Sequence, residues 1–184
     1  MKIRQLLPVI FIFFGINSAA ESPDKSHGFS VGYEIGSIAN GLALGARVAS
    51  PSFFHNIFRA TAKANLGWVQ NVVPTGENEA TWLRYGLFRL GIQGGVFVQD
   101  LPIRIMSSAE VALVVPQSKI SSKNLIFGLA GNMDIEFFMD PMRSHAMVLS
   151  MGGIGLIPPT ADNLPGKPSF ANGFLASFGY RFYL

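Results

Sequence analysis

Apolar residues recur at every second position over most of this chain, and that alternation restricts what the sequence can fold into. From residue 29 the odd positions hold Phe29, Val31 and Tyr33, and small or polar residues separate them. Side chains of a β-strand alternate between its two faces, so this segment predicts a strand with one apolar and one polar face. The same pattern predicts an all-β fold of eight strands, at roughly residues 28–37, 41–50, 57–70, 82–98, 102–115, 123–138, 144–157 and 170–184.

The prolines support these strand boundaries. Proline has no backbone N–H to donate to a ladder, so it is confined to strand edges and connections. Every proline after residue 20 lies before, between or at the edge of the eight segments. Two segments are less regular. Arg84 and Arg89 fall at opposite parity, so a β-bulge near residues 87–88 is expected to bring both to one face. The Gly-rich segment 144–157 leaves its register open.

The first twenty residues are typical of a cleaved secretory signal peptide. Basic residues at positions 2 and 4 precede an apolar stretch at 6–15, and small residues at 18–20 form a cleavage site. An uncleaved N-terminal anchor is the alternative. Cleavage before Glu21 removes two of the 14 basic residues and none of the 11 acidic ones, so the net charge falls from +3 to +1. So small a positive excess gives no reason to expect a nucleic-acid partner.

The remaining chain, residues 21–184, is expected to form a membrane barrel. Only 14% of the residues are charged, against about a quarter in a typical soluble domain. No run of roughly 20 apolar residues follows position 20, so a transmembrane helix is not expected. In a bilayer every backbone polar group must be paired internally, so a spanning sheet must close. The even number of strands and the alternation of short and longer connections predict an eight-stranded antiparallel transmembrane up-and-down β-barrel. A soluble lipocalin-like barrel, with its apolar face inside, is the alternative.

The polar face of the strands carries most of the charge, and we expect it to line the barrel lumen. Isolated charges there would cost much free energy, so a paired network is predicted. An eight-stranded barrel is just wide enough for side chains to fill it. The prediction is therefore a plugged lumen, and a narrow pore with a mild anion preference is the alternative. The predicted lumen charges are Glu34, Arg47, Arg59, Lys63, Arg84, Arg89, Arg104, Glu110, Asp134, Glu136 and Arg181.

The last strand ends in alternating aromatic and aliphatic residues, Phe178, Tyr180, Phe182 and Leu184. This ending resembles the terminal strand of bacterial outer-membrane proteins, although Leu184 stands where that family usually has phenylalanine. Residues 28–184 are similar in size and strand number to the transmembrane domain of outer-membrane protein A. The resemblance implies a monomer in the Gram-negative outer membrane, surrounded by outer-membrane lipid and lipopolysaccharide. It also implies recognition of the last strand by the barrel-assembly machinery, and short turns in the periplasm.

A catalytic role is not expected. Some small outer-membrane barrels that resemble this chain modify lipid A acyl chains with a histidine, a serine and an acidic residue near the outer leaflet. The implied orientation places His27, His55 and His145 at the periplasmic end instead. The His-x-Ser spacing is absent, and His145 and Ser150 fall on opposite faces of a strand, so no serine has a base beside it. No metal site or cofactor motif is found. A lipid A-modifying enzyme is the least favoured alternative.

The favoured interpretation is a barrel with a structural or surface-interaction role; a transporter for small or hydrophobic solutes is the main alternative. The longer connections near 71–81 and 158–169 are candidates for binding an extracellular partner, and their composition is equally that of ordinary solvated loops. Trp68, Trp82 and Tyr85 are expected at the lipid interface, where aromatic side chains anchor barrels. Trp82 has the parity of the inner face unless it lies beyond the membrane.

Overall fold

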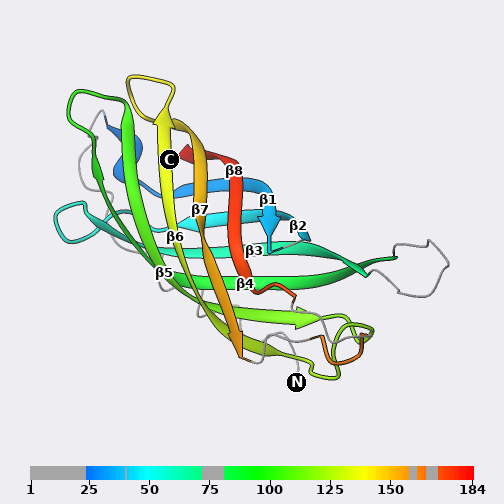
Figure 1. Cartoon of the computed structure of the whole chain (residues 1–184). Helices are drawn as coiled ribbons and strands as arrows, with labels where there is room; N and C mark the ends of the chain where they lie inside the picture. The colour runs from blue at the N-terminus through cyan, green and yellow to red at the C-terminus, as the bar shows by residue number, and fades with distance from the viewer. Residues whose placement is uncertain (1–23, 40, 72–80, 158–160, 165–169) are drawn as a thin grey trace.

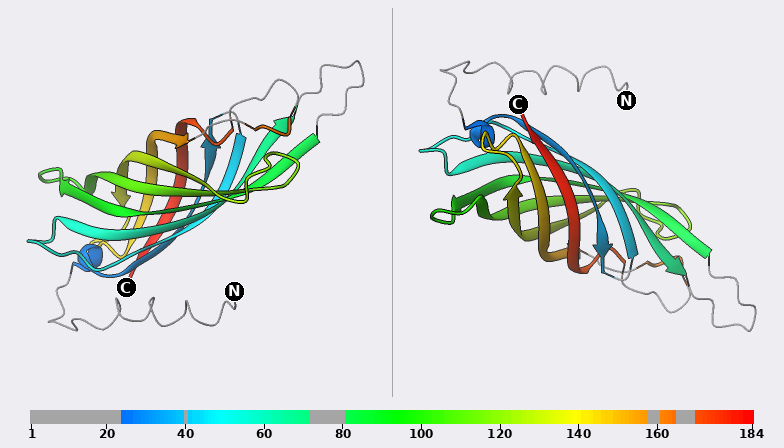
Figure 2. Two further views of the ribbon diagram at one scale, coloured as in Figure 1. Left: turned by 90° about the horizontal axis from the view of Figure 1, so that it is seen from below. Right: turned by 90° about the horizontal axis from the view of Figure 1, so that it is seen from above.

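The eight strands form one closed antiparallel barrel, in which each strand pairs with the next and β8 pairs with β1 (Figures 1 and 2). The computed structural model describes residues 24–39, 41–71, 81–157, 161–164 and 170–184. Within them, no helix is long and apolar enough to cross a membrane. The predicted all-β up-and-down topology is confirmed. The strands are β1 (Ser30–Ile38), β2 (Gly41–Ala49), β3 (Phe58–Asn71), β4 (Thr81–Phe97), β5 (Ile103–Pro116), β6 (Ile126–Phe138), β7 (His145–Ile157) and β8 (Gly173–Tyr183).

The two ends of the barrel differ. One end, here called the terminal end, carries the 3-10 turn η3 (Lys25–His27), Leu184 and the connections 50–57, 98–102 and 139–144. The opposite end, called the loop end, carries the connections 39–40, 72–80, 117–125 and 158–172. The strands begin and end close to their predicted bounds; β6 begins at Ile126 rather than 123, and β8 at Gly173 rather than 170. The predicted signal segment lies outside the described residues.

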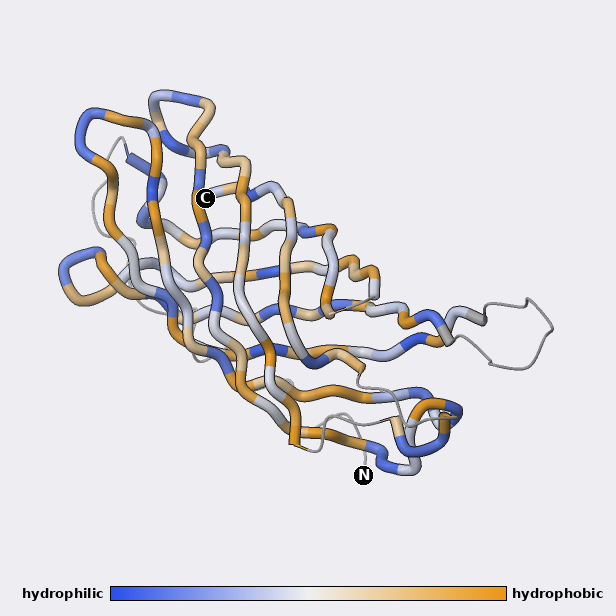
Figure 3. Tube along the Cα trace, viewed as in Figure 1, coloured by the Kyte–Doolittle hydropathy of each residue, from blue (hydrophilic) through white to orange (hydrophobic). Residues whose placement is uncertain are grey.

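The barrel is apolar outside, and its lumen is charged toward the terminal end and apolar toward the loop end, unlike a lipocalin-like barrel, whose apolar face lines the whole interior. Figure 3 shows hydrophobic and hydrophilic residues alternating along the strands. On β6, Leu129 points outward with 67% of its surface exposed, while Asp134 points inward and is fully buried. β7 follows the same rule, with Met147 and Leu149 outward and the even-numbered Val148 inward. Other exposed residues of the outer face include Tyr33, Ile35, Leu44, Leu90, Ile92, Val111, Phe127 and Phe178.

β4 corrects three predictions. Its register with β3 and β5 runs without an inserted residue, so the β-bulge expected near residues 87–88 is absent. Arg89 points inward, whereas Arg84 points outward and is exposed. Arg84 was therefore wrongly assigned to the lumen. Trp82 is exposed on the outer face, and Tyr85, predicted at the lipid interface, is buried inside the barrel. The error arose from assuming that the whole inner face is polar.

Glycines on the inner face let large side chains fit inside the barrel. Gly67 of β3 lies opposite Tyr85 of β4. A Cβ atom on Gly67 would lie 2.2 Å from the Cζ atom of Tyr85, so the phenol ring occupies the space of the missing side chain. Gly45 makes room for Asn65 in the same way, with 2.0 Å between its ideal Cβ and the Asn65 Nδ2 atom. Small residues thus allow a narrow lumen to be filled.

Candidate functional site

Charged side chains fill the lumen except at its loop end. Ten of the eleven predicted lumen charges, all except Arg84, lie inside with at most 7% of their surface exposed. They form two clusters. The arginine cluster comprises Arg47, Arg59, Arg104, Arg181, Asp134 and Glu136, and the lysine cluster comprises Lys63, Arg89, Glu34 and Glu110.

Two carboxylates on β6 hold the arginine cluster together. Asp134 accepts from Arg47 of β2 at 2.7 Å and from Arg181 of β8 at 2.5 Å. Glu136 accepts from Arg104 Nε at 2.8 Å and from Arg59 at 3.2 Å. Arg181 also donates to Glu136, so this guanidinium bridges the two carboxylates. The cluster joins strands that are not neighbours in the sheet, because β2 and β3 lie across the lumen from β6.

Two uncharged side chains complete the arginine cluster. The Gln93 amide donates to Asp134 at 2.7 Å, and its oxygen accepts from Arg59 Nε at 3.1 Å. The Tyr183 hydroxyl donates to Glu136 at 2.5 Å and accepts from Arg59 and Arg104. Neither residue was among the predicted site residues. The alternation along each strand could have predicted both, because Gln93 lies on the same face of β4 as Arg89, and Tyr183 lies on the same face of β8 as Arg181.

The lysine cluster has a similar construction with balanced charge. Glu110 lies 2.7 Å from Lys63 Nζ and 3.4 Å from Arg89 Nη1. Arg89 also donates to Glu34 of β1 at 2.7 Å. Asn65 donates to Glu34 at 2.7 Å. These contacts link β1 to β4 across the lumen and fix the mutual positions of the strands that carry them.

The loop end of the lumen is closed by apolar residues from two connections. Phe170 has only 1% of its surface exposed, and its ring meets that of Tyr85 edge to face with 5.8 Å between centroids. The sequence pattern predicted Phe170 at the start of the last strand and left the 158–169 connection open between a partner-binding and a solvated loop, so the cap was not predicted. The cap residues Ile120, Ala161, Leu164, Phe170 and Ala171 pack in one cluster with the inner-face residues Ile38, Val69, Leu83, Tyr85, Leu87, Val114, Ile126, Leu156 and Leu175.

Hydrogen bonds join the two connections that make the cap. Asn163 donates its backbone N–H to the Ile120 carbonyl at 3.1 Å and its side-chain amide to the Ser118 carbonyl at 2.7 Å. Asp162 accepts from the backbone and hydroxyl of Ser122. Hydrogen bonds from Ser121 and Ser122 lower the pKa of the exposed Asp162 carboxyl to about 2. A depressed carboxyl pKa keeps this contact intact until the pH falls toward that value.

Replacing Tyr85 by phenylalanine is expected to stabilise the barrel slightly. The Tyr85 hydroxyl is buried within the apolar cap region and has no hydrogen-bond partner. Removing an unsatisfied buried hydroxyl relieves a desolvation cost of about 1 kcal/mol or somewhat more. The midpoint of urea unfolding in detergent should therefore rise. A fall would show that the hydroxyl has a partner, and Tyr183→Phe, which loses three hydrogen bonds, is the destabilising comparison.

The segment around η3 closes the terminal end. Ser26 is fully buried, and its carbonyl accepts from Arg104 of the arginine cluster at 2.9 Å. Lys25 donates its backbone N–H to Met142 at 2.9 Å, and Asp24 pairs with Arg143 at 2.8 Å. The His27 ring meets that of Phe97 edge to face, with centroids 6.0 Å apart. Apolar packing therefore covers the loop end of the lumen, whereas hydrogen bonds, an ion pair and an aromatic contact hold the segment that covers the terminal end.

Docking of the η3 segment is expected to weaken in mildly acidic solution. Burial lowers the pKa of the His27 imidazole; Asp24 opposes this shift, and Arg104, Arg143 and Arg59 add to it. A base whose pKa is lower in the docked state binds fewer protons there, so docking is fully favourable above the ordinary pKa of about 6.5 and weakens as the pH falls below it.

Cysteine labelling can measure this weakening, because the chain contains no cysteine. A Ser26→Cys variant should react faster with a maleimide at pH 5.5 than at pH 7.5, after normalisation to the exposed Lys123→Cys variant. Adding His27→Gln should abolish the difference. A pH-independent ratio with His27 intact would contradict the prediction.

The histidines lie where the sequence placed them along the chain, all at the terminal end. The rings of His27 and His145 contact aromatic rings, and the Nδ1 atom of each is buried without a hydrogen-bond partner. His55 is exposed in the connection 50–57. In the described part of the chain, no group of three or more His, Cys, Asp or Glu residues is placed to hold a metal ion.

The predicted assembly residues share the outer face of β8. Phe178, Phe182 and Leu184 are exposed, and the Tyr180 ring stacks on that of Tyr33 across the β1–β8 pair, with centroids 6.2 Å apart. A protein that recognises this strand would need these side chains to point outward and to be accessible. Their recognition by an assembly machinery remains a prediction.

Comparison of the sequence with protein-family models finds no match, and no curated protein is significantly similar to it.

Proposed function

We propose that this chain is an integral protein of the Gram-negative outer membrane, a plugged barrel with a structural or surface-interaction role. The main support for this proposal is that the barrel has the opposite polarity to a soluble protein. Large apolar side chains cover its outside, and ten charged side chains are buried inside. In water, so much exposed apolar surface would drive association, because monomeric soluble proteins rarely expose large contiguous apolar patches. In a bilayer the same face is solvated by lipid.

The way the lumen is filled supports a plug rather than a conduit. The arginine cluster fills the lumen next to the terminal end and the lysine cluster lies further in, while the apolar cap covers the loop end and the η3 segment covers the terminal end. Opening a path through the lumen would require breaking buried ion pairs. Each broken pair leaves a buried charge without its partner, which costs about 3–5 kcal/mol. The network therefore fixes the barrel and its register.

The resemblance of the last strand to outer-membrane proteins suggests the orientation. The terminal end would face the periplasm, and the cap at the loop end would face outside. Trp82, exposed near the loop end of β4, would then lie at the outer lipid interface. A surface partner would meet the connections of the loop end. We propose no catalytic role, since His27 and His145 contact aromatic rings at the opposite end.

Cell fractionation combined with gel electrophoresis tests this proposal. Expressed with its N-terminal segment in a Gram-negative host, the protein should sediment with outer membranes and resist extraction by alkaline carbonate. An unboiled sample should migrate differently from a boiled one, because the closed barrel survives the detergent. A protein found in the soluble periplasm, or one with identical migration before and after boiling, would overturn the proposal. An altered lipid A mass that depends on the protein would overturn its non-catalytic part.

A further inference from the structure

The arginine cluster carries more positive charge than its carboxylates neutralise. Its four guanidinium groups face only Asp134 and Glu136, whereas in the lysine cluster two cations face two carboxylates. Within the described residues, the lumen therefore holds a formal surplus of two positive charges. Removing a charge from water costs several kcal/mol unless a partner compensates it. The surplus calls for a further partner.

Neutral groups partner three of the four arginines, Arg104, Arg59 and Arg47. Arg104 donates to the Ser26 carbonyl and the Tyr183 hydroxyl, and its guanidinium lies 5.2–5.3 Å from three aromatic ring centroids. Arg59 donates to Tyr183 and lies 5.4 Å from its ring centroid. Arg47 donates through its two terminal nitrogens to Asp134 and to the Gln93 oxygen. It is buried, and its Nε–H has no hydrogen-bond partner. The unsatisfied donor therefore lies on the Arg47 side of the cluster.

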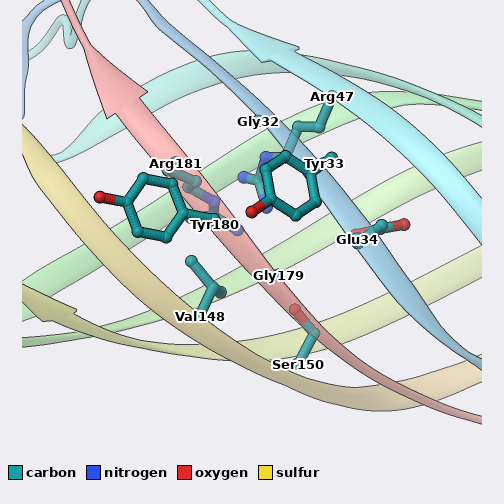
Figure 4. A pocket seen from close by; sticks show the side chains of 9 residues that line it. All are labelled: Gly32, Tyr33, Glu34, Arg47, Val148, Ser150, Gly179, Tyr180 and Arg181. Carbon is teal, nitrogen blue, oxygen red and sulfur yellow. The ribbon is translucent and has the colours of Figure 1, made fainter.

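A small hollow lies beside Arg47. Gly32 of β1 and Gly179 of β8 line its wall without contributing a side chain. Figure 4 shows Arg47 and Arg181 reaching toward each other from the two sides of β1. The other residues that line the hollow are Tyr33, Glu34, Val148, Ser150 and Tyr180. The Glu34 carboxylate already accepts hydrogen bonds from Arg89 and Asn65.

We propose that this hollow binds a small monatomic anion of the chloride class, held by the Arg47 Nε–H and the Arg181 guanidinium. The charge surplus selects an anion over a cation. The narrow space between two glycines selects a small ion over a bulky organic anion. Bound there, the ion supplies the negative charge that the arginine cluster lacks and stabilises the folded barrel by mass action.

Anion-dependent stability of the detergent-folded barrel tests the proposal. Thermal unfolding is followed by the gel shift in sodium gluconate and in sodium bromide at equal ionic strength. The midpoint should rise saturably with bromide, by at least about 5 °C when bromide reaches about a hundredfold its dissociation constant. Equal midpoints in the two salts at every concentration would overturn the proposal, since gluconate screens charge without fitting the hollow.

A matched pair of variants locates the site. Val148 lines the hollow and is buried, and aspartate is close to valine in size. Val148→Asp supplies a fixed carboxylate and should remove the bromide effect, whereas the neutral Val148→Asn should retain it. A bromide effect that persists in Val148→Asp would place the ion elsewhere and overturn the assignment.

A crystal of the unmodified protein grown with bromide keeps the proposal testable if Val148→Asp fails to fold. An anomalous peak within contact distance of Arg47 and Arg181 is expected. A hollow without one at saturating bromide would contradict the proposal.

Discussion

Replacing Glu136 by glutamine is expected to lower the free energy of unfolding by about 3–5 kcal/mol, because it removes one partner of a buried charge network. The carboxylate is fully buried and binds Arg59, Arg104 and Arg181. Without it the four guanidinium groups share only Asp134. The shape of the side chain hardly changes, so the loss reports charge rather than packing. Urea titration of the folded fraction, measured by the gel shift, gives the free energy.

Asp100→Asn is the matched control for this loss of charge. Asp100 lies exposed in the connection 98–102, so its amide should change stability by no more than about 0.5 kcal/mol. Equal effects of the two substitutions would show that the lumen charges contribute nothing particular. They would contradict the role given to the network.

An arginine on the outer face should distinguish a membrane barrel from a soluble one. Leu129 lies on the outer face of β6, 67% exposed, three residues after the strand begins and opposite Val111 in the central part of β5. In a bilayer, Leu129→Arg should cost about 2–4 kcal/mol, because it places a charge in hydrocarbon. On a solvated surface the same change would be nearly neutral. Unfolding in lipid vesicles by urea measures the difference.

Ile157→Arg provides the position control for Leu129→Arg. Ile157 ends β7 at the loop end and is 79% exposed. Near the membrane interface an arginine should cost only about 0–1 kcal/mol. If both variants in vesicles lose no stability, the outer face is not in contact with lipid. If both variants lose the same stability, lipid contact extends as far as the loop end of β7.

The strands could be predicted from the sequence because each obeys a local rule. A side chain's parity depends only on its position along its own strand, so Asp134 and Glu136 of β6 were assigned to the inner face without knowing their neighbours. The exclusion of proline from strand interiors fixed the boundaries just as locally. Closure followed from the need to pair every backbone group in a membrane.

β4 shows where this local rule failed. A polar residue was equated with an inward one, and at the loop end the inner face is apolar because the cap covers it. Arg84 was therefore placed inside and Tyr85 outside, when both are the other way round. Ile120 lies in an irregular connection without periodicity, and Phe170 was predicted to begin the last strand, so nothing in their spacing indicated that they turn back into the barrel.

The specific partners within the lumen could not be predicted either. The ion pair of Arg47 with Asp134 joins residues 87 positions apart, and it depends on which strands face each other across the lumen. Alternation places both residues inside without determining their mutual distance. The same is true of the hollow beside Arg47, which depends on two glycines from opposite ends of the chain, Gly32 and Gly179, meeting at the β1–β8 seam.

Electrical recording tests the central claim, a membrane barrel with a filled lumen, most directly. Protein refolded into a planar bilayer, with its folded state verified by the gel shift, is expected to leave the membrane at its baseline conductance at either polarity. The proposed plug consists of the charge clusters, the apolar cap and the η3 segment, which together occupy the described part of the lumen. Discrete and reproducible openings of the unmodified protein would contradict the account, and their reversal potential in asymmetric salt would then report the selectivity of a pore.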